Sequence, residues 1–212
     1  MTILPHIMVE LLSDTCFSRG EGTPGAVDVE IEHDELGLPY LSGKTMRGLI
    51  RDTWLSIARS FEELHEAGLR VWGPVGDLDE TSILRFGDAQ LDASVRDWIT
   101  WAEKRTHAPI SPQAVLEALT DVRSQTSEER KTGAPAETTL RSIRVALRGL
   151  KFSAPISWMD APREADLKCL ALSVLGTRHA GLGRNRGRGF VRLLLINGNR
   201  DLTRALANGG RA

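Results

Sequence analysis

The sequence predicts an α+β fold of the ferredoxin-like, or RRM-like, kind. Two observations lead to this prediction: four apolar or alternating runs have strand character, and two long segments have apolar residues that recur every three to four positions. Their order is strand–helix–strand, an insertion, then strand–helix–strand, which is the order of the ferredoxin-like core. A chain of 212 residues is expected to form a single domain, 1–212, here with insertions at about 13–40 and 93–139.

The first strand–helix–strand unit is expected in the first half of the chain. Residues 3–12 are mostly apolar and predict one strand, and residues 82–91 predict another. A helix is predicted from about 43 to 64, because its apolar residues fit a 3.6-residue period. The loop before this helix is rich in glycine and proline, although residues 27–31 alternate like a short strand.

The second unit follows a polar insertion. Residues 150–158 alternate between apolar and polar side chains, which predicts a strand with one buried face. A helix is predicted over 162–180, with Asp160 as its cap, and a final strand over 190–196. The remaining residues, 197–212, contain glycines and scattered charges, and we expect this tail to be frayed.

The insertion between the two units is expected to be partly helical. Ser111 followed by Pro112 predicts a helix that begins there and ends near Asp121, because serine caps helices and proline suits their first position. Trp98 and Trp101 could stack on a base, but we expect them to pack in the core.

The segment Gly181–Gly189 contains four glycines and three arginines directly before the last predicted strand. Glycine allows a close approach of the backbone to a ligand, and arginine presents a fork of donors that suits phosphate. The segment is therefore interpreted as a loop that holds a phosphodiester backbone. It is not a dinucleotide fingerprint, because a helix precedes it and a strand follows it, which is the reverse of the required order. The alternative is a basic turn without a ligand.

The net charge is −1, but the charges are unevenly distributed. The first 42 residues contain eight acidic side chains and a single cation, Arg19, whereas residues 178–192 contain five arginines and no acidic residue. A basic patch is therefore expected in spite of the near-neutral sum. The acidic residues Glu30, Glu32 and Asp34 are interpreted as part of a solvated loop.

A second basic cluster lies at the start of the first predicted helix. Lys44, Arg47 and Arg51 share one face of its first turns, where the helix dipole already places positive charge. A bound anion would relieve this conflict, using free backbone N–H groups and the side chains together. The alternative is an ordinary solvated basic face.

Other compositional signals point to a location in the cytoplasm without membrane contact. No apolar run approaches the ~18 residues of a membrane helix, and no secretory signal is evident at the start. Cys16 and Cys169 are too far apart in sequence to indicate a disulfide framework or a metal site.

Several segments together resemble the RAMP superfamily, and within it the backbone subunits of type III CRISPR effector complexes. The blocks that carry the resemblance are Gly25-Ala26-Val27-Asp28, the segment 36–48 (LGLPYLSGKTMRG), the segment 126–134 (TSEERKTGA) with Leu140-Arg141, the glycine-rich loop 181–189, and the smaller Trp72-Gly73 and Phe86-Gly87-Asp88-Ala89. Their order and spacing cover most of the chain.

The resemblance implies that several copies of the chain line up along a guide RNA together with other subunits of the complex. Each copy would extend a thumb-like β-hairpin through the duplex of guide and complementary target RNA. It also implies that the target is cut beside that hairpin, only within the assembled complex, with weakly bound Mg²⁺ or Mn²⁺. By this resemblance Asp28 is the catalytic and metal-binding candidate. The candidate RNA contacts include basic residues noted above. They are Arg19, Ser42, Lys44, Arg47, Arg51, Arg130, Lys131, Arg141, Gly181, Gly183, Arg184, Arg186, Gly187, Arg188 and Gly189.

The chain departs from the family pattern at one point. The family often has a histidine shortly before the aspartate, but residues 15–20 contain none, and Arg19 is the candidate replacement. This departure favours one alternative, a non-cutting structural or capping subunit. Two others also stay open: a guide-RNA-processing endoribonuclease of the same superfamily, and an unrelated RNA-binding module.

Overall fold

The computed structural model describes residues 5–74, 76, 81–126, 140–184 and 186–209. The elements are β1 (His6–Leu11), α1 (Gly43–Ile57), α2 (His65–Trp72), β2 (Leu84–Phe86), α3 (Ala93–Glu103), α4 (Pro112–Leu119), β3 (Thr120–Gln125), β4 (Arg141–Ala146), β5 (Lys151–Trp158), α5 (Glu164–Gly176), β6 (Val191–Asn197), β7 (Arg200–Asp201) and α6 (Thr203–Ala207). Two short 3₁₀ turns, Ala58–Ser60 and Glu62–Leu64, join α1 to α2.

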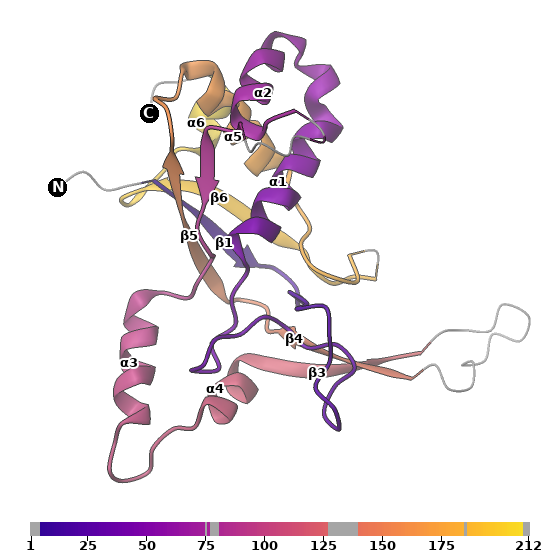
Figure 1. The fold of residues 1–212 in the computed structure, drawn as a ribbon, viewed down its shortest axis with the longest axis vertical. Coiled ribbons are helices and arrows are strands. Elements are labelled where there is room, and N and C mark those ends of the chain that lie inside the picture. Colours follow the sequence, from indigo (N-terminus) through magenta and orange to yellow (C-terminus); the bar gives the residue numbers. More distant parts are fainter. Residues whose placement is uncertain (1–4, 75, 77–80, 127–139, 185, 210–212) are drawn as a thin grey trace, which may run out of the picture.

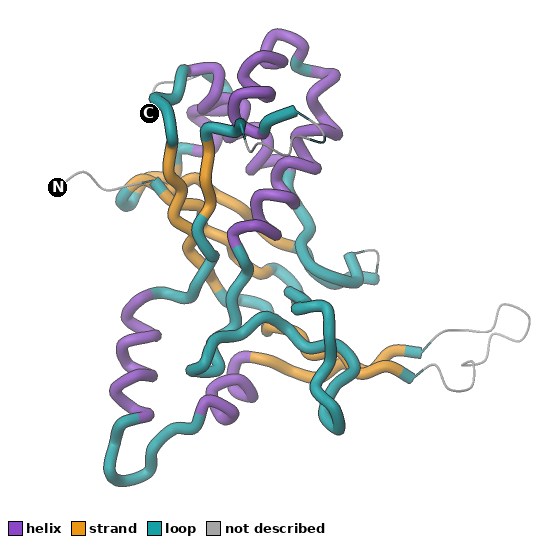
Figure 2. The backbone as a smooth tube through the Cα atoms, viewed as in Figure 1, coloured by secondary structure: helices purple, strands orange, loops and turns teal. Residues whose placement is uncertain are grey.

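The main sheet has the strand order β2-β5-β1-β6-β7 (Figures 1 and 2). Each neighbouring pair in it is antiparallel; opposite Val9 lie Phe152 of β5 and Leu193 of β6. Burial alternates strictly along β5, as the sequence predicts for a sheet with one covered face.

Helices cover that buried face (Figure 1). Apolar side chains from β1, β5 and β6 pack there against α1, α2, α5 and α6, around fully buried residues such as Met46, Ile50 and Leu170. The opposite face of β5 presents exposed side chains, including Lys151 and Ser153.

A second layer of structure lies below the main sheet in Figure 1. It consists of α3, α4, the hairpin of β3 and β4, and the long loop 13–40, which runs beside the hairpin (Figure 2). A small apolar cluster of Leu38, Ile99 and Val115 ties the loop to α3 and α4.

The structure confirms the four predicted core strands, as β1, β2, β5 and β6, and the helix that begins at Pro112 after the Ser111 cap. It also corrects several boundaries. The first helix ends at Ile57 instead of continuing to Leu64, because two 3₁₀ turns intervene, and a separate helix, α2, follows. Residues 27–31 make isolated bridges and no strand.

Further corrections concern the second half. The helix predicted over 162–180 spans only Glu164–Gly176, and Arg163 occupies the cap position while Asp160 pairs with Arg70 at 3.1 Å. The tail is not frayed up to residue 209, because it forms β7 and α6. Trp98 and Trp101 do not pack in the core, since they are 54% and 58% exposed on α3.

Among the described residues, no helix is both long and apolar enough to cross a membrane.

Candidate nucleic-acid interface

The glycine-rich loop is fixed to the body of the protein at both of its ends. The Leu182 N–H donates to the Cys16 carbonyl at 3.0 Å, and the Gly189 N–H donates to the Asp14 carbonyl at 3.0 Å. The Ala180 N–H also donates to the Gly189 carbonyl at 2.8 Å, which joins the two ends of the loop. Gly181 and Gly189 have φ values of 76° and 72°, and a Cβ on either would overlap a backbone carbonyl, that of Cys16 or Ala180. These two glycines are therefore required by the fold itself.

The tip of the same loop is open. Gly183 and Gly187 have φ values of 78° and 73°, yet a Cβ would meet nothing within 4 Å at Gly187 and only the Arg188 side chain at Gly183. The Arg186 N–H donates to the Gly183 carbonyl at 2.8 Å, which closes a turn at the tip. The backbone here faces no other part of the described chain, so a ligand can approach it closely.

The arginines of the loop meet the β3–β4 hairpin across a basic hollow of about 560 Å³. Its lining residues are Val29, Gln125, Arg141, Ile143, Gly181, Leu182, Gly183, Arg184, Arg186 and Arg188. In the part of the chain that the structure describes, no carboxylate pairs with any of these four arginines. The arrangement makes a positive surface that is suited to phosphates.

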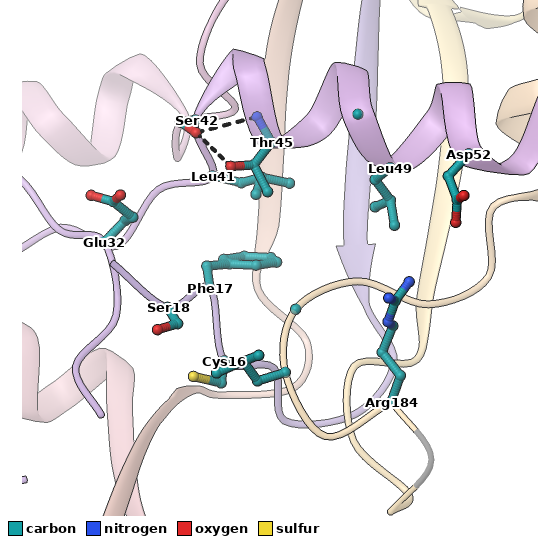
Figure 3. A pocket seen from close by; sticks show the side chains of 13 residues that line it. Cys16, Phe17, Ser18, Glu32, Leu41, Ser42, Thr45, Leu49, Asp52 and Arg184 are labelled. Carbon is teal, nitrogen blue, oxygen red and sulfur yellow. Dashed lines mark hydrogen bonds between the residues drawn. The ribbon is translucent and has the colours of Figure 1, made fainter. Parts of the chain in front are cut away.

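A second hollow, of about 340 Å³, lies between the same loop and the start of α1 (Figure 3). Phe17, Leu41 and Leu49 form an apolar wall. Arg184 extends from the loop toward α1, and Ser42 caps the helix, with its Oγ 3.4 Å from the Thr45 N–H that donates to it. The apolar wall can accept a base. The helix N-terminus and the arginine beside it can accept a phosphate.

The cations on α1 do not form one free basic face. Lys44 is exposed, but an Arg47 Nη donates to the Trp72 carbonyl at 3.0 Å, and an Arg51 Nη donates to the Pro74 carbonyl at 2.6 Å. Both arginines therefore bind carbonyls at the C-terminal end of α2, where the helix dipole favours positive charge. The sequence did not reveal this role because α2 was not predicted.

Asp28 lies exposed on loop 13–40, against the first residues of β4. Its Oδ2 accepts hydrogen bonds from the Ser142 N–H at 2.7 Å and from the Ser142 hydroxyl at 3.0 Å. These two bonds, helped by the charge of Arg141, lower the pKa of the Asp28 carboxyl, so the carboxylate is ionised at neutral pH. No described residue makes a hydrogen bond with the second oxygen, Oδ1.

A buried ion pair lies two residues further along both segments. Glu30 and Arg144 are only 2% and 7% exposed, and the Arg144 Nε donates to the Glu30 Oε1 at 2.8 Å. The Val29 N–H donates to the Ser142 carbonyl at 3.1 Å, and the Arg144 N–H donates to the Val29 carbonyl at 3.0 Å. The loop is thus locked onto β4 in parallel alignment, which fixes the position of Asp28.

This pairing corrects the interpretation of a solvated acidic loop. Besides Glu30, the Glu32 carboxylate accepts from the Tyr40 hydroxyl at 3.0 Å, and Asp34 pairs with Arg96 at 2.6 Å. These three carboxylates hold the loop together, whereas Asp28 faces outward.

The other candidates are placed as follows. Arg19 is exposed, and its Nη2 donates to the Thr23 hydroxyl at 3.2 Å. Arg130 and Lys131 lie outside the described residues. Within the described ranges, no group of three or more histidine, cysteine, aspartate or glutamate side chains is arranged to hold a metal ion.

The likeness of the chain to known proteins is one of fold and of family. No curated protein matches the chain. The fold is similar to a chain in the cryo-EM structure of the type III-B Cmr-beta bound to cognate target RNA, with 12% identity, a TM-score of 0.67, and coverage of 92% of this chain and 98% of that one. A chain of the apo Cmr-beta structure gives a TM-score of 0.68 at the same identity and coverage.

A family model adds what structural likeness at such low identity does not. The model of the RAMP superfamily matches residues 9–192, which include loop 13–40, α1, β5, α5 and the glycine-rich loop. The chain therefore belongs to the RAMP superfamily.

Proposed function

We propose that the chain is a guide-RNA-binding backbone subunit of a type III CRISPR effector complex, and that it cleaves complementary target RNA within that complex. The observation that carries the proposal is the basic hollow between the glycine-rich loop and β4, which has four arginines that pair with no carboxylate of the described residues and lies beside an exposed, ionised aspartate. Membership of the RAMP superfamily and the likeness to Cmr-beta chains support it.

The proposal includes a ferredoxin-like core with a thumb. The order β2-β5-β1-β6 with antiparallel neighbours supports the core, because β1, β2, β5 and β6 are the strands of the two strand–helix–strand units. The β3–β4 hairpin, which projects away from the main sheet in Figure 1, is the proposed thumb. Further copies of the chain, other subunits and the two RNAs are the proposed partners.

The residues around Asp28 fit a divalent cation only if RNA supplies further ligands. Mg²⁺ is commonly held by one or two carboxylates together with waters and phosphate oxygens. The Asp28 Oδ1, which is free of bonds to described residues, would hold Mg²⁺ or Mn²⁺ together with oxygens of the scissile phosphate. Such an ion, when bound, offsets the negative charge that develops on the phosphate.

The protein residues then have distinct tasks. The lowered pKa makes Asp28 a weak proton acceptor, so its task is to hold and orient groups at the phosphate. Ser142 keeps the carboxylate in one orientation through two hydrogen bonds. Arg141, next to Ser142 and lining the basic hollow, places positive charge beside the reacting phosphate.

The test is Asp28→Asn, which keeps the shape of the side chain and removes its charge. The complex reconstituted with guide RNA is expected to bind target RNA normally and to lose target cleavage in Mg²⁺ or Mn²⁺, because the basic surface that supplies affinity remains. Glu21→Gln, an exposed change on the same loop, is the matched control and should cut normally. Cleavage that persists in Asp28→Asn would remove Asp28 from the mechanism.

A second candidate is a non-cutting subunit of the same complex. It is favoured because no group of three or more histidine, cysteine, aspartate or glutamate side chains among the described residues is arranged to hold a metal ion, and because residues 15–20 contain no histidine. A wild-type complex that binds target RNA and never cuts it would select this candidate over the first.

A further inference from the structure

The outer edge of the main sheet contains a short unpaired stretch on β6. The Leu12 N–H donates to the Phe190 carbonyl at 2.8 Å, so alternate residues from Phe190 onward turn their backbone groups toward β1. The backbone N–H and C=O groups of the other residues therefore point toward the outside of the sheet. These residues are Val191, Leu193 and Leu195. The strand β7 lies along this edge and pairs with β6 only at Ile196 and Asn197.

Both ends of the stretch are closed by other parts of the chain. The Val191 N–H donates to the Arg178 carbonyl at 2.9 Å. The Leu195 N–H donates to the Thr203 hydroxyl at 2.8 Å, and the Leu195 carbonyl accepts from Leu202 at 2.9 Å. Between them, no described residue makes an outward hydrogen bond with the N–H or the C=O of Leu193. Unpaired groups of this kind are a template for an added strand.

A hollow of about 530 Å³ lies over this stretch. Apolar side chains form part of its wall: Leu12, Leu175, Phe190 and Leu194. Three cations surround them, Arg178, Arg192 and Arg204. Only Arg192 pairs with a carboxylate of the described chain, Glu10 at 3.2 Å, so the hollow is positively charged in spite of Asp201 in its wall.

We propose that this edge binds an extended acidic peptide segment of a partner protein, which adds a short strand to β6 at Leu193. A peptide backbone supplies both an acceptor for the Leu193 N–H and a donor for its C=O, whereas the phosphates of RNA only accept. Carboxylates of the segment face Arg178 and Arg204, and its apolar side chains contact the leucines of the wall. The hollow shares no lining residue with the two hollows of the candidate nucleic-acid interface, so the proposal does not depend on RNA binding.

The probe is a fluorescein-labelled peptide of alternating glutamate and valine, titrated with the full chain and followed by anisotropy. We expect saturable binding with a Kd below ~1 mM. Two matched peptides separate the contributions: replacement of glutamate by lysine removes the charge match, and N-methylation of the backbone removes the donors. Each should weaken binding about tenfold or more. In parallel, hydrogen exchange of the Leu193 amide should slow only with the unmodified peptide.

Two charge-reversal variants locate the site. Arg178→Glu/Arg204→Glu should weaken peptide binding about tenfold or more while RNA affinity stays unchanged, and the control Arg184→Glu/Arg186→Glu should do the reverse. Equal binding of the N-methylated peptide, or unchanged exchange at Leu193, would overturn strand addition even if a variant failed to fold. Loss of RNA affinity in Arg178→Glu/Arg204→Glu, with peptide binding unchanged, would assign the hollow to RNA instead.

Discussion

The buried pair of Glu30 and Arg144 should be the contact on which the position of Asp28 depends most. Glu30→Gln removes the charge of Glu30 and keeps its volume, which leaves Arg144 buried at 7% exposure without a carboxylate. Among the described residues, the side-chain partner that Arg144 keeps is the Thr120 hydroxyl at 3.3 Å. Breaking a buried pair in this way costs about 3–5 kcal/mol.

The lower end of that range is expected here, because the glutamine Oε1 can still accept the bond that the Ile31 N–H donates at 3.0 Å. A loss of about 3 kcal/mol corresponds to a fall in Tm of about 6–12 °C for a chain of this size. Denaturant unfolding of the wild type, Glu30→Gln, Arg144→Met and the double variant gives the coupling between the two residues directly. Glu21→Gln, which is exposed on the same loop, is the control and should change stability little.

The double variant Glu30→Gln/Arg144→Met shows whether the two residues act as a unit. If the pair acts as a unit, removal of both charges should cost less than the sum of the single losses, since no uncompensated charge stays buried. Target cleavage by the assembled complex should fall with each single variant, because the loop no longer holds Asp28 against Ser142. Strictly additive losses, or a loss below about 1 kcal/mol for Glu30→Gln, would refute the reasoning.

The remaining predictions concern the glycine-rich loop, RNA affinity, the Asp28 carboxyl and the Cys16 thiol. Gly187→Ala should cost only the ~1–2 kcal/mol of a left-handed alanine, whereas Gly189→Ala should cost more because its Cβ overlaps a carbonyl; equal losses in denaturant melts would contradict the assignment of an open loop tip. RNA affinity should fall steeply as salt rises, and salt-insensitive binding would exclude a grip on the phosphate backbone. An NMR titration should place the Asp28 pKa below its ordinary 3.8 and move it upward in Ser142→Ala. The contact between Asp28 and Ser142 therefore stabilises the fold at pH values above the ordinary pKa, and this stabilisation is lost as the pH falls through the lowered pKa. An unshifted Asp28 pKa would refute this contact. Burial raises the pKa of the Cys16 thiol to about 11, so iodoacetamide should leave it unmodified at pH 8 in the native protein, and rapid labelling would contradict its burial.

The regular elements of the core could be predicted because their apolar periods are strong. The alternation along residues 151–158 and the helical period after Gly43 both appear in the structure. The end of the first helix could not be predicted, since neither proline nor glycine marks the 3₁₀ turns that follow Ile57. The helix α3 could not be recognised from an apolar period, because only two of its residues, Ile99 and Ala102, are buried.

The site was predicted less completely than the fold, because its critical contacts join residues far apart in the chain. Nothing local distinguishes Glu30 from its acidic neighbours, and its partner Arg144 lies 114 residues away. Arg47 has the same difficulty, since its role depends on a carbonyl at the end of α2. Glycine-rich segments are easier to recognise, although the sequence could not divide the loop into anchoring and open glycines.

The strand β4 connects RNA binding to the proposed chemistry. Arg141 lines the basic hollow, Ser142 holds the Asp28 carboxylate, and Arg144 holds the loop on which Asp28 lies. These three residues occupy successive or alternate positions of one strand, so a shift of the hairpin moves the cation, the carboxylate and the loop together. We therefore expect RNA that binds in the hollow to act on the orientation of Asp28 through Ser142. Ser142→Ala should accordingly lower the rate of cleavage while leaving RNA affinity unchanged, because the arginines of the hollow remain.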